Sequence, residues 1–210
     1  MQEEIFLSTA YFPPSVCFSL TSAAEKVVVE RWENYHKQTY RNRCVILGAN
    51  GPISLVVPVI RGSFHKTAIR DLLVDDMLKW RTIHVRSIIS AYAMAPYFEY
   101  YIDIIENAIN KKCRYLIDYN HNITEQINNC IGLSVPFVFS EEFTPVTGRT
   151  NDYRYSISPK IKTPVEGYSE KPYLQVFSDK FGFTPGLSII DTLLNNGPGT
   201  LAILRESLVY

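Results

Sequence analysis

Arg41 and Arg43 stand two residues apart, at the start of a stretch whose composition is typical of a β-strand. In an extended chain, residues two apart point to the same face. Two guanidinium groups on one face would bind a phosphate or carboxylate through paired hydrogen bonds. Asn42 lies between them, and Tyr35 and Lys37 precede them with the same spacing. We therefore predict a ligand-binding strand here; the alternative is the polar outer face of an ordinary strand.

Basic residues are concentrated in one part of a chain that is neutral overall, with 21 Lys+Arg and 21 Asp+Glu. Residues 35–70 contain six basic residues, Lys66 among them, and no acidic one. Residues 35–98 contain nine basic and three acidic residues, a surplus of six, and the rest of the chain has the opposite surplus. If the fold gathers this window around a cleft, the cleft attracts anions. The alternative is that the two parts pair as ordinary surface charge.

His84 has neighbours that favour proton transfer. It follows Trp80 by one helical turn and Arg81 by three residues. Histidine commonly acts as a general acid or base, and we predict His84 as a catalytic residue, with Trp80 and Arg81 contacting the substrate. The alternative is a half-buried imidazole hydrogen-bonded to a backbone carbonyl.

Ser188 and Asp191 stand three residues apart at the start of the last clear helical pattern. Either Ser188 caps this helix and Asp191 reaches back, or Thr184 is the cap. Because a helix N-terminus also binds anions, Ser188 is a candidate substrate-binding residue and Asp191 a second catalytic candidate. A serine nucleophile is not predicted, since the sequence contains no GxSxG motif.

The hydrophobic patterns predict an α/β fold, a single domain over residues 1–210 with a small mixed sheet flanked by helices. A strand, a helix and a second strand at the N-terminus predict a βαβ-like unit, and Asn50-Gly51 predicts a hairpin turn. Residues 140–172 are predicted to be mostly loop. The predicted strands are 5–11, 27–29, 42–47, 53–60 and 135–139, and the predicted helices are 15–24, 77–95, 96–108, 123–131, 184–196 and 200–208.

Composition excludes several classes of protein. Hydrophobic residues make up 46% of the chain, so it is not disordered, and its neutrality argues against bulk electrostatic binding to nucleic acid. The N-terminus is acidic and no long apolar run follows, so we expect a cytoplasmic protein without a membrane segment. The four cysteines and four histidines show no metal-ligand spacing, and we expect free thiols, no metal and no cofactor.

An ordered set of short motifs resembles the WbqC-like family over nearly the whole chain. The N-terminal part of the set is Tyr11-Phe12-Pro13-Pro14, residues 33–37, Tyr40-Arg41-Asn42-Arg43, Asn50-Gly51-Pro52 and Val57-Pro58-Val59. The rest is Trp80-Arg81, His84, Ala91-Tyr92, residues 95–98, residues 186–191 and Asn196-Gly197-Pro198. Longer members carry an extra segment with a tyrosine-x-serine-glycine signature, which residues 151–160 lack, so the chain is similar to a compact branch found in Bacteroidetes.

The resemblance implies a role in surface-polysaccharide biosynthesis. Our first hypothesis is a group-transfer enzyme for an anionic or nucleotide-linked sugar or acyl donor. Arg41, Arg43 and Lys66 would hold the anion, and Tyr35, Asn42 and Trp80 would position the sugar or acyl part. The second hypothesis is a non-catalytic module that binds an anionic metabolite or a protein. Nucleic acid and membrane partners are not expected, and the oligomeric state stays open.

Overall fold

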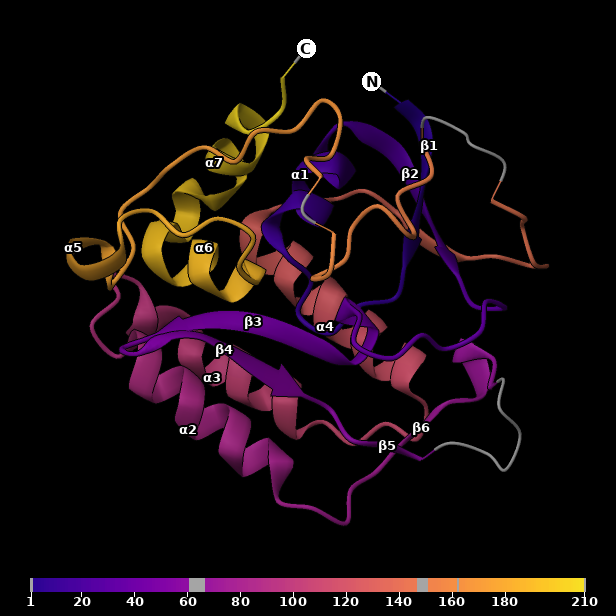
Figure 1. Cartoon of the computed structure of the whole chain (residues 1–210), viewed down its shortest axis with the longest axis horizontal. Helices are drawn as coiled ribbons and strands as arrows, with labels where there is room; N and C mark the ends of the chain where they lie inside the picture. Colours follow the sequence, from indigo (N-terminus) through magenta and orange to yellow (C-terminus); the bar gives the residue numbers. More distant parts are fainter. Residues whose placement is uncertain (1, 61–66, 147–150, 162, 210) are drawn as a thin grey trace.

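Two short apolar runs form the buried centre of a parallel sheet (Figure 1). The fold is that of a computed structural model that describes residues 2–60, 67–146, 151–161 and 163–209. Strands β1 (Gln2–Ser8), β2 (Ala24–Glu30) and β7 (Phe137–Phe139) are parallel, in the order β1-β2-β7. Ile5 pairs with Val27, which in turn pairs with Phe137. Since strands of such sheets are covered on both faces, their centres are continuous apolar runs.

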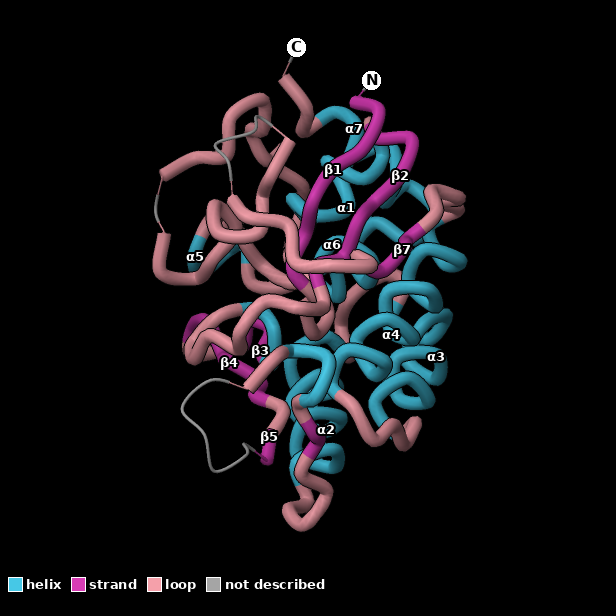
Figure 2. Tube along the Cα trace, turned by 90° about the vertical axis from the view of Figure 1, so that its right-hand side faces the viewer, coloured by secondary structure: helices cyan, strands magenta, loops and turns pink. Residues whose placement is uncertain are grey.

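Helices pack against this sheet and cover it. Helix α1 (Ser15–Ser22) connects β1 to β2, and α4 (Leu116–Ile131) precedes β7. Figure 2 shows the three strands side by side, with α1 behind them and α4 below β7, and residues of both helices line one small cavity against the sheet. Helix α3 (Phe98–Asn110) packs against α4 and against α2 (Trp80–Tyr92).

A β-hairpin packs against α2. Strands β3 (Arg43–Gly48) and β4 (Gly51–Val56) are antiparallel and joined by a two-residue turn. Gly51 has a φ of 111°, which residues with a Cβ rarely adopt. A short antiparallel pair, β5 (Val59–Ile60) with β6 (Leu73–Val74), follows the hairpin.

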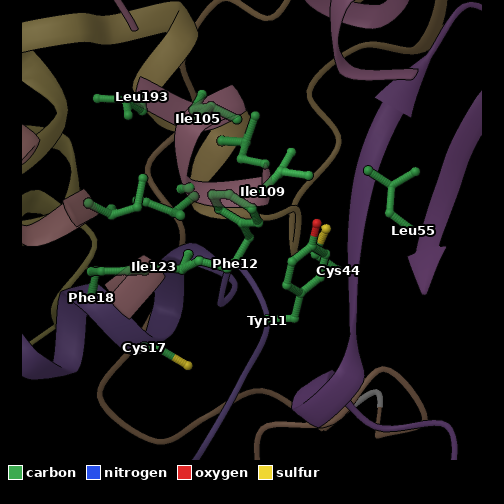
Figure 3. Packing of buried hydrophobic residues seen from close by; sticks show 14 of the residues in the cluster. Tyr11, Phe12, Cys17, Phe18, Cys44, Leu55, Ile105, Ile109, Ile123 and Leu193 are labelled. Atoms are coloured by element: carbon green, nitrogen blue, oxygen red, sulfur yellow. The ribbon is translucent and has the colours of Figure 1, made fainter. Parts of the chain in front are cut away.

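The C-terminal helices close the core. Helix α5 (Ser178–Phe181) is one turn long, α6 (Ile189–Asn196) is almost fully buried, and α7 (Thr200–Glu206) packs on α1. Figure 3 shows the buried side chains around Tyr11 and Phe12, which come from β-strands, from α1, α3 and α4 and from α6. One connected core therefore joins both ends of the chain, as expected of one domain.

The structure confirms the predicted α/β class, the N-terminal βαβ unit and the hairpin. Helix α4 begins at Leu116 and not at residue 123, because Tyr119 and Asn120 are buried and extend the apolar face across a polar stretch. The predicted strand 53–60 is interrupted, since Pro58 has no N–H for a ladder. The last long helical pattern begins at Ile189, five residues after Thr184, and the single turn of α5 was not predicted.

No helix in the described ranges combines the length and the apolar character that spanning a bilayer requires.

Gly197 provides a test of this packing, because its backbone has a φ of 52° and a Cβ built there would lie 2.4 Å from the ring of Tyr97. We expect Gly197→Ala to lower the free energy of unfolding by about 2–4 kcal/mol through backbone strain and overpacking. Denaturant titration measures the change. Gly199→Ala is the matched control, since nothing lies within 4 Å of its Cβ position. Equal stability of the two variants would contradict the described packing.

Candidate functional site

The carboxyl ends of β1 and β2 lie next to each other, because Ser8 pairs with Glu30 in the parallel register. Ser140 follows directly after β7 at the same edge. Ligands of open α/β sheets bind beyond this edge. Buried polar side chains gather here, and we call this group the strand-end cluster: Ser8, Glu30, Glu33, Arg41, Asp152 and Arg154.

Arg41 forms a two-pronged pair with Glu33. Its Nε donates to Oε1 at 2.9 Å and its Nη2 donates to Oε2 at 2.6 Å. Nη2 also donates to Ser8 Oγ at 2.6 Å. The two charged side chains are only 4% and 0% exposed, so each depends on the other for compensation of its charge. The guanidinium also lies 5.7 Å from the centre of the Tyr155 ring.

Arg154 joins the other two carboxylates of the cluster. Its Nε and Nη2 donate to Asp152 at 2.8 Å and 2.5 Å, and its Nη1 donates to Glu30 at 3.2 Å and to the Thr144 carbonyl at 2.7 Å. The hydrogen bond to Asp152 raises the pKa of the Arg154 guanidinium, so the side chain stays charged. Glu30 accepts a further bond from Ser140 Oγ at 2.7 Å.

The strand-end cluster therefore contains three carboxylates and two guanidiniums, and its charged groups are largely neutralised by one another. Arg41 Nη1 is a remaining donor, since it donates to no other residue that the structure describes. A cavity of about 20 Å³ adjoins the cluster, a space for one hydroxyl-sized group. Its polar lining is Ser8, Thr9, Tyr40, Arg41, Tyr153 and Arg154.

His84 lies in a second polar group, inside the core. Its Nδ1 is 2.9 Å from the Tyr11 hydroxyl, and its ring also hydrogen-bonds to the backbone of Val56. Trp80 packs edge-on against the imidazole at 5.1 Å. Burial lowers the pKa of His84 from 6.5 to about 4, so the ring is neutral at pH 7. A neutral ring with one donor and one acceptor nitrogen matches these two partners.

Tyr11 connects this group to the hairpin and to α6. Figure 3 shows its hydroxyl beside the Cys44 thiol of β3, and the Ser188 N–H donates to the Val45 carbonyl of the same strand at 2.8 Å. Burial raises the pKa of the Cys44 thiol well above its ordinary value, which keeps it protonated. These contacts tie β1, β3, α2 and α6 together at the centre of the core.

Trp80 and Arg81 are held by contacts with neighbouring loops. The Trp80 indole Nε1 donates to the Asp75 carbonyl at 3.0 Å. Arg81 lies 4.3 Å from the Trp80 ring, pairs with Asp76 at 2.9 Å and donates to the carbonyls of Ile109 and Lys111. Both side chains thus stabilise the N-terminal end of α2.

Asp191 lies in a third polar group and is 0% exposed. Its carboxylate accepts hydrogen bonds from Tyr173 at 2.8 Å, Tyr92 at 2.9 Å and Gln175 at 3.0 Å. Burial raises its pKa, and these donors oppose the rise. Tyr92 also accepts a bond from the Leu47 N–H, so the group links α6, α2 and β3.

Ser188 is the N-cap of α6, as one of the two alternatives predicted. Its hydroxyl accepts from the Ile190 N–H at 3.3 Å and donates to the Phe12 carbonyl at 2.9 Å. Asp191 does not reach back to it, because the Ser188 N–H donates to Val45 and the carboxylate is engaged by the tyrosines. Thr184 lies before the helix and is not its cap.

The predicted geometry of the arginine pair is wrong. Tyr40–Asn42 form a single 3-10 turn and β3 begins only at Arg43, so Arg41 and Arg43 do not share a strand face. The turn lets Arg41 reach Glu33 in the interior, whereas Arg43 is half-buried and its Nε has no partner among the described residues. Asn42 donates to the Val57 carbonyl at 2.8 Å, which anchors the turn.

The other predicted binding residues, Tyr35, Lys37 and Lys66, differ in their burial and in whether the structure describes them. Tyr35 is half-buried against the core and Lys37 is exposed. Lys66 lies outside the described residues. No hydrogen bond between described residues joins Arg41, His84 and Asp191 directly; each has its own set of partners. The roles predicted for these residues therefore stay predictions.

Several residues of the strand-end cluster were not predicted from the sequence. Ser8 and Glu30 are the last residues of buried strands, a position that points to such an edge. Asp152 and Arg154 lie in a segment without regular structure and give no comparable signal. Glu170 was also missed: burial raises its pKa to about 7, and it accepts the Gly186 N–H at 2.7 Å.

A comparison with protein-family models matches the WbqC-like protein family over residues 9–165 of the 210. Comparisons with curated proteins and with solved structures give no significant match. Within the described residues, no three His, Cys, Asp or Glu side chains are arranged to hold a metal ion.

The depressed pKa of His84 makes a testable contribution to stability. Because the folded protein holds this ring neutral, its contribution is fully present above the ordinary pKa of 6.5 and is lost as the pH falls toward about 4. We expect the stability difference between the wild type and His84→Gln to shrink by about 3 kcal/mol from pH 7 to pH 4. Denaturant titration at each pH, with an NMR titration of the ring, measures it. A difference that stays constant with pH would contradict the burial of His84.

Proposed function

The chain belongs to the WbqC-like protein family, and from that premise we propose that it is a group-transfer enzyme for an anionic or nucleotide-linked sugar or acyl donor. The polar part of the donor binds at the strand-end cluster. In this proposal the reaction belongs to surface-polysaccharide biosynthesis, the role that the resemblance to the family implies. The observation that carries the proposal is the small cavity beside Arg41, lined by both polar and apolar residues, at the carboxyl edge of the parallel sheet.

The chemistry of the cluster suits a polyhydroxylated group. A sugar hydroxyl both donates and accepts, and Arg41 Nη1 offers a donor next to carboxylates that accept. A cavity of about 20 Å³ admits one hydroxyl, so the remainder of the ring lies at the mouth. Tyr155 is 37% exposed and its ring centre lies 5.7 Å from the Arg41 guanidinium, so it offers an aromatic surface near Arg41.

Proton transfer is assigned in this proposal to His84 and Asp191. The Nδ1 atom of His84 bonds to the Tyr11 hydroxyl, so a proton reaches or leaves this atom through Tyr11. Asp191 has two tyrosine hydroxyls, Tyr92 and Tyr173, as its proton-bearing neighbours. An acceptor oxygen attacks the donor, the bond to the donor's leaving group breaks, and the leaving group takes the electron pair. The acceptor's proton passes to His84 or Asp191 through the tyrosine hydroxyls that contact them.

A second candidate function is binding of an anionic metabolite without catalysis. It is favoured by the burial of His84 and Asp191 and by the partners that each already has within the chain. A catalytic group has to contact the substrate or reach it through a hydrogen-bonded relay. In this alternative both residues only stabilise the core.

The binding site is tested by titrating the protein with nucleotide-linked sugars and acyl-coenzyme A esters in a calorimeter. We expect saturable binding that weakens at least tenfold in the double variant Glu33→Gln/Arg41→Gln. Removing both charges together avoids leaving one charged side chain buried without its partner. Arg86→Gln, at an exposed position of α2, is the matched control and should bind like the wild type. Unchanged affinity in the double variant would exclude the strand-end cluster as the site.

Turnover separates the two candidate functions. We expect the wild type to release the nucleoside diphosphate or free coenzyme A when an acceptor sugar is added. His84→Gln should lower this rate at least a hundredfold with little change in donor affinity, because general acid–base catalysis typically contributes this much. Binding without release would favour the non-catalytic alternative, and an unchanged rate in the variant would remove His84 from the mechanism.

A further inference from the structure

Two arginines beside the strand-end cluster are not neutralised as Arg41 and Arg154 are. Arg31 and Arg70 both lie against the indole ring of Trp32, with the guanidinium carbons 5.3 Å and 3.7 Å from the ring centre. We propose that these two arginines bind the diphosphate group of a nucleotide-linked donor. This inference rests on the proposed function and assigns the anionic half of the substrate to its own site.

The backbone fixes the two arginines relative to each other. The Arg70 N–H donates to the Arg31 carbonyl at 3.1 Å, and the next bond along this pair runs from Ile69 to Glu33 at 2.9 Å. The two segments therefore lie side by side for several residues. Stacking on one indole further restricts both side chains, so less conformational entropy is lost when a ligand binds.

Trp32 is itself held by the edge of the sheet. Its indole Nε1 donates to the Ser140 carbonyl at 3.1 Å, and its backbone N–H donates to Glu30 at 2.8 Å. The Arg31 N–H donates to Ser140 Oγ at 3.1 Å, and Ser140 donates to Glu30 in turn. The aromatic platform is thus connected directly to the strand-end cluster through Glu30.

The charges of Arg31 and Arg70 are available to a ligand. Arg31 forms no ion pair with any described residue, and its buried Nε has no hydrogen-bond partner there. Arg70 pairs at 3.3 Å with Asp71, whose side chain is 60% exposed, and such surface pairs contribute little. Glu141 and Glu142 follow Ser140 and are exposed, and neither pairs with these arginines in the described structure.

A diphosphate matches this arrangement better than a single phosphate does. Each guanidinium presents paired donors to two oxygens of one phosphoryl group, so two arginines can serve two linked phosphoryl groups. Arg31 directly follows Glu30, and Arg70 follows the residue that bonds to Glu33. A donor with its diphosphate here has its sugar beside the strand-end cluster, whose own net charge is unfavourable for an anion.

Calorimetric titration with inorganic pyrophosphate, uridine diphosphate and inorganic phosphate tests this site on the full chain. We expect pyrophosphate and uridine diphosphate to bind at least tenfold more tightly than phosphate. Arg31→Gln and Arg70→Gln should each weaken pyrophosphate binding at least tenfold, and Arg70→Lys should weaken it less, because it keeps the charge. Arg86→Gln is again the control. Affinity that is unchanged in both glutamine variants, or lowered equally in the control, would overturn the assignment.

The same titrations distinguish failure of this inference from failure of the proposed function. Suppose pyrophosphate binding depends on Arg31 and Arg70, but nucleotide-linked sugars bind no more tightly than pyrophosphate. Suppose also that their affinity is the same in the wild type and in Glu33→Gln/Arg41→Gln. The diphosphate site then stands and the sugar site falls. Suppose instead that nucleotide-linked sugars depend on the double variant but not on Arg31 or Arg70. The proposed function then stands and this inference is wrong.

Discussion

Two guanidinium groups buried at the carboxyl ends of the parallel strands hold together segments that are far apart in sequence. Arg154 donates to Glu30, which is 124 residues away in the sequence. Arg41 donates to Glu33 and to Ser8 in the same interior region. Each charged group is compensated only while its partners stay in place, and a buried charge left alone is strongly destabilising. The path of the chain after β1, after β2 and around residue 154 is therefore set by these pairs.

The remaining polar groups of the core extend this constraint. Asn120 on α4 donates to Thr9 and to the Arg41 carbonyl, so the helix behind the sheet is tied to the strand-end cluster. On the other side of the core, Asp191 gathers Tyr92, Tyr173 and Gln175 around the N-terminal turn of α6. A buried carboxylate without a basic partner is tolerable only when several donors surround it, and the helix dipole adds to their effect.

The elements of this fold follow from local patterns, whereas the polar groups depend on distant contacts. Periodicity predicted α2 and α3, because burial repeats within each helix, and the Asn50-Gly51 turn predicted the hairpin. For α4 periodicity predicted too short a helix, because the buried Tyr119 and Asn120 look like part of a polar stretch in the sequence. One partner of His84, Tyr11, is 73 residues away and one partner of Asp191, Tyr92, is 99 residues away, and no local pattern in the sequence specifies either of them. The sequence therefore marked these residues as unusual without indicating what they contact.

The basic window of the sequence, residues 35–98, also shows that contacts within the fold are not visible in local sequence patterns. Two of its described arginines are neutralised inside the fold, because Arg41 pairs with Glu33 from just outside the window and Arg81 pairs with Asp76 from within it. Arginines that are matched inside the fold position the backbone and offer few donors to a ligand. Arg31 and Arg70 differ because both lie against the indole of Trp32, and the one carboxylate that pairs with them in the described structure, Asp71 with Arg70, is 60% exposed. An aromatic ring orders a guanidinium without cancelling its charge, and this difference decides where an anionic ligand gains the most from binding.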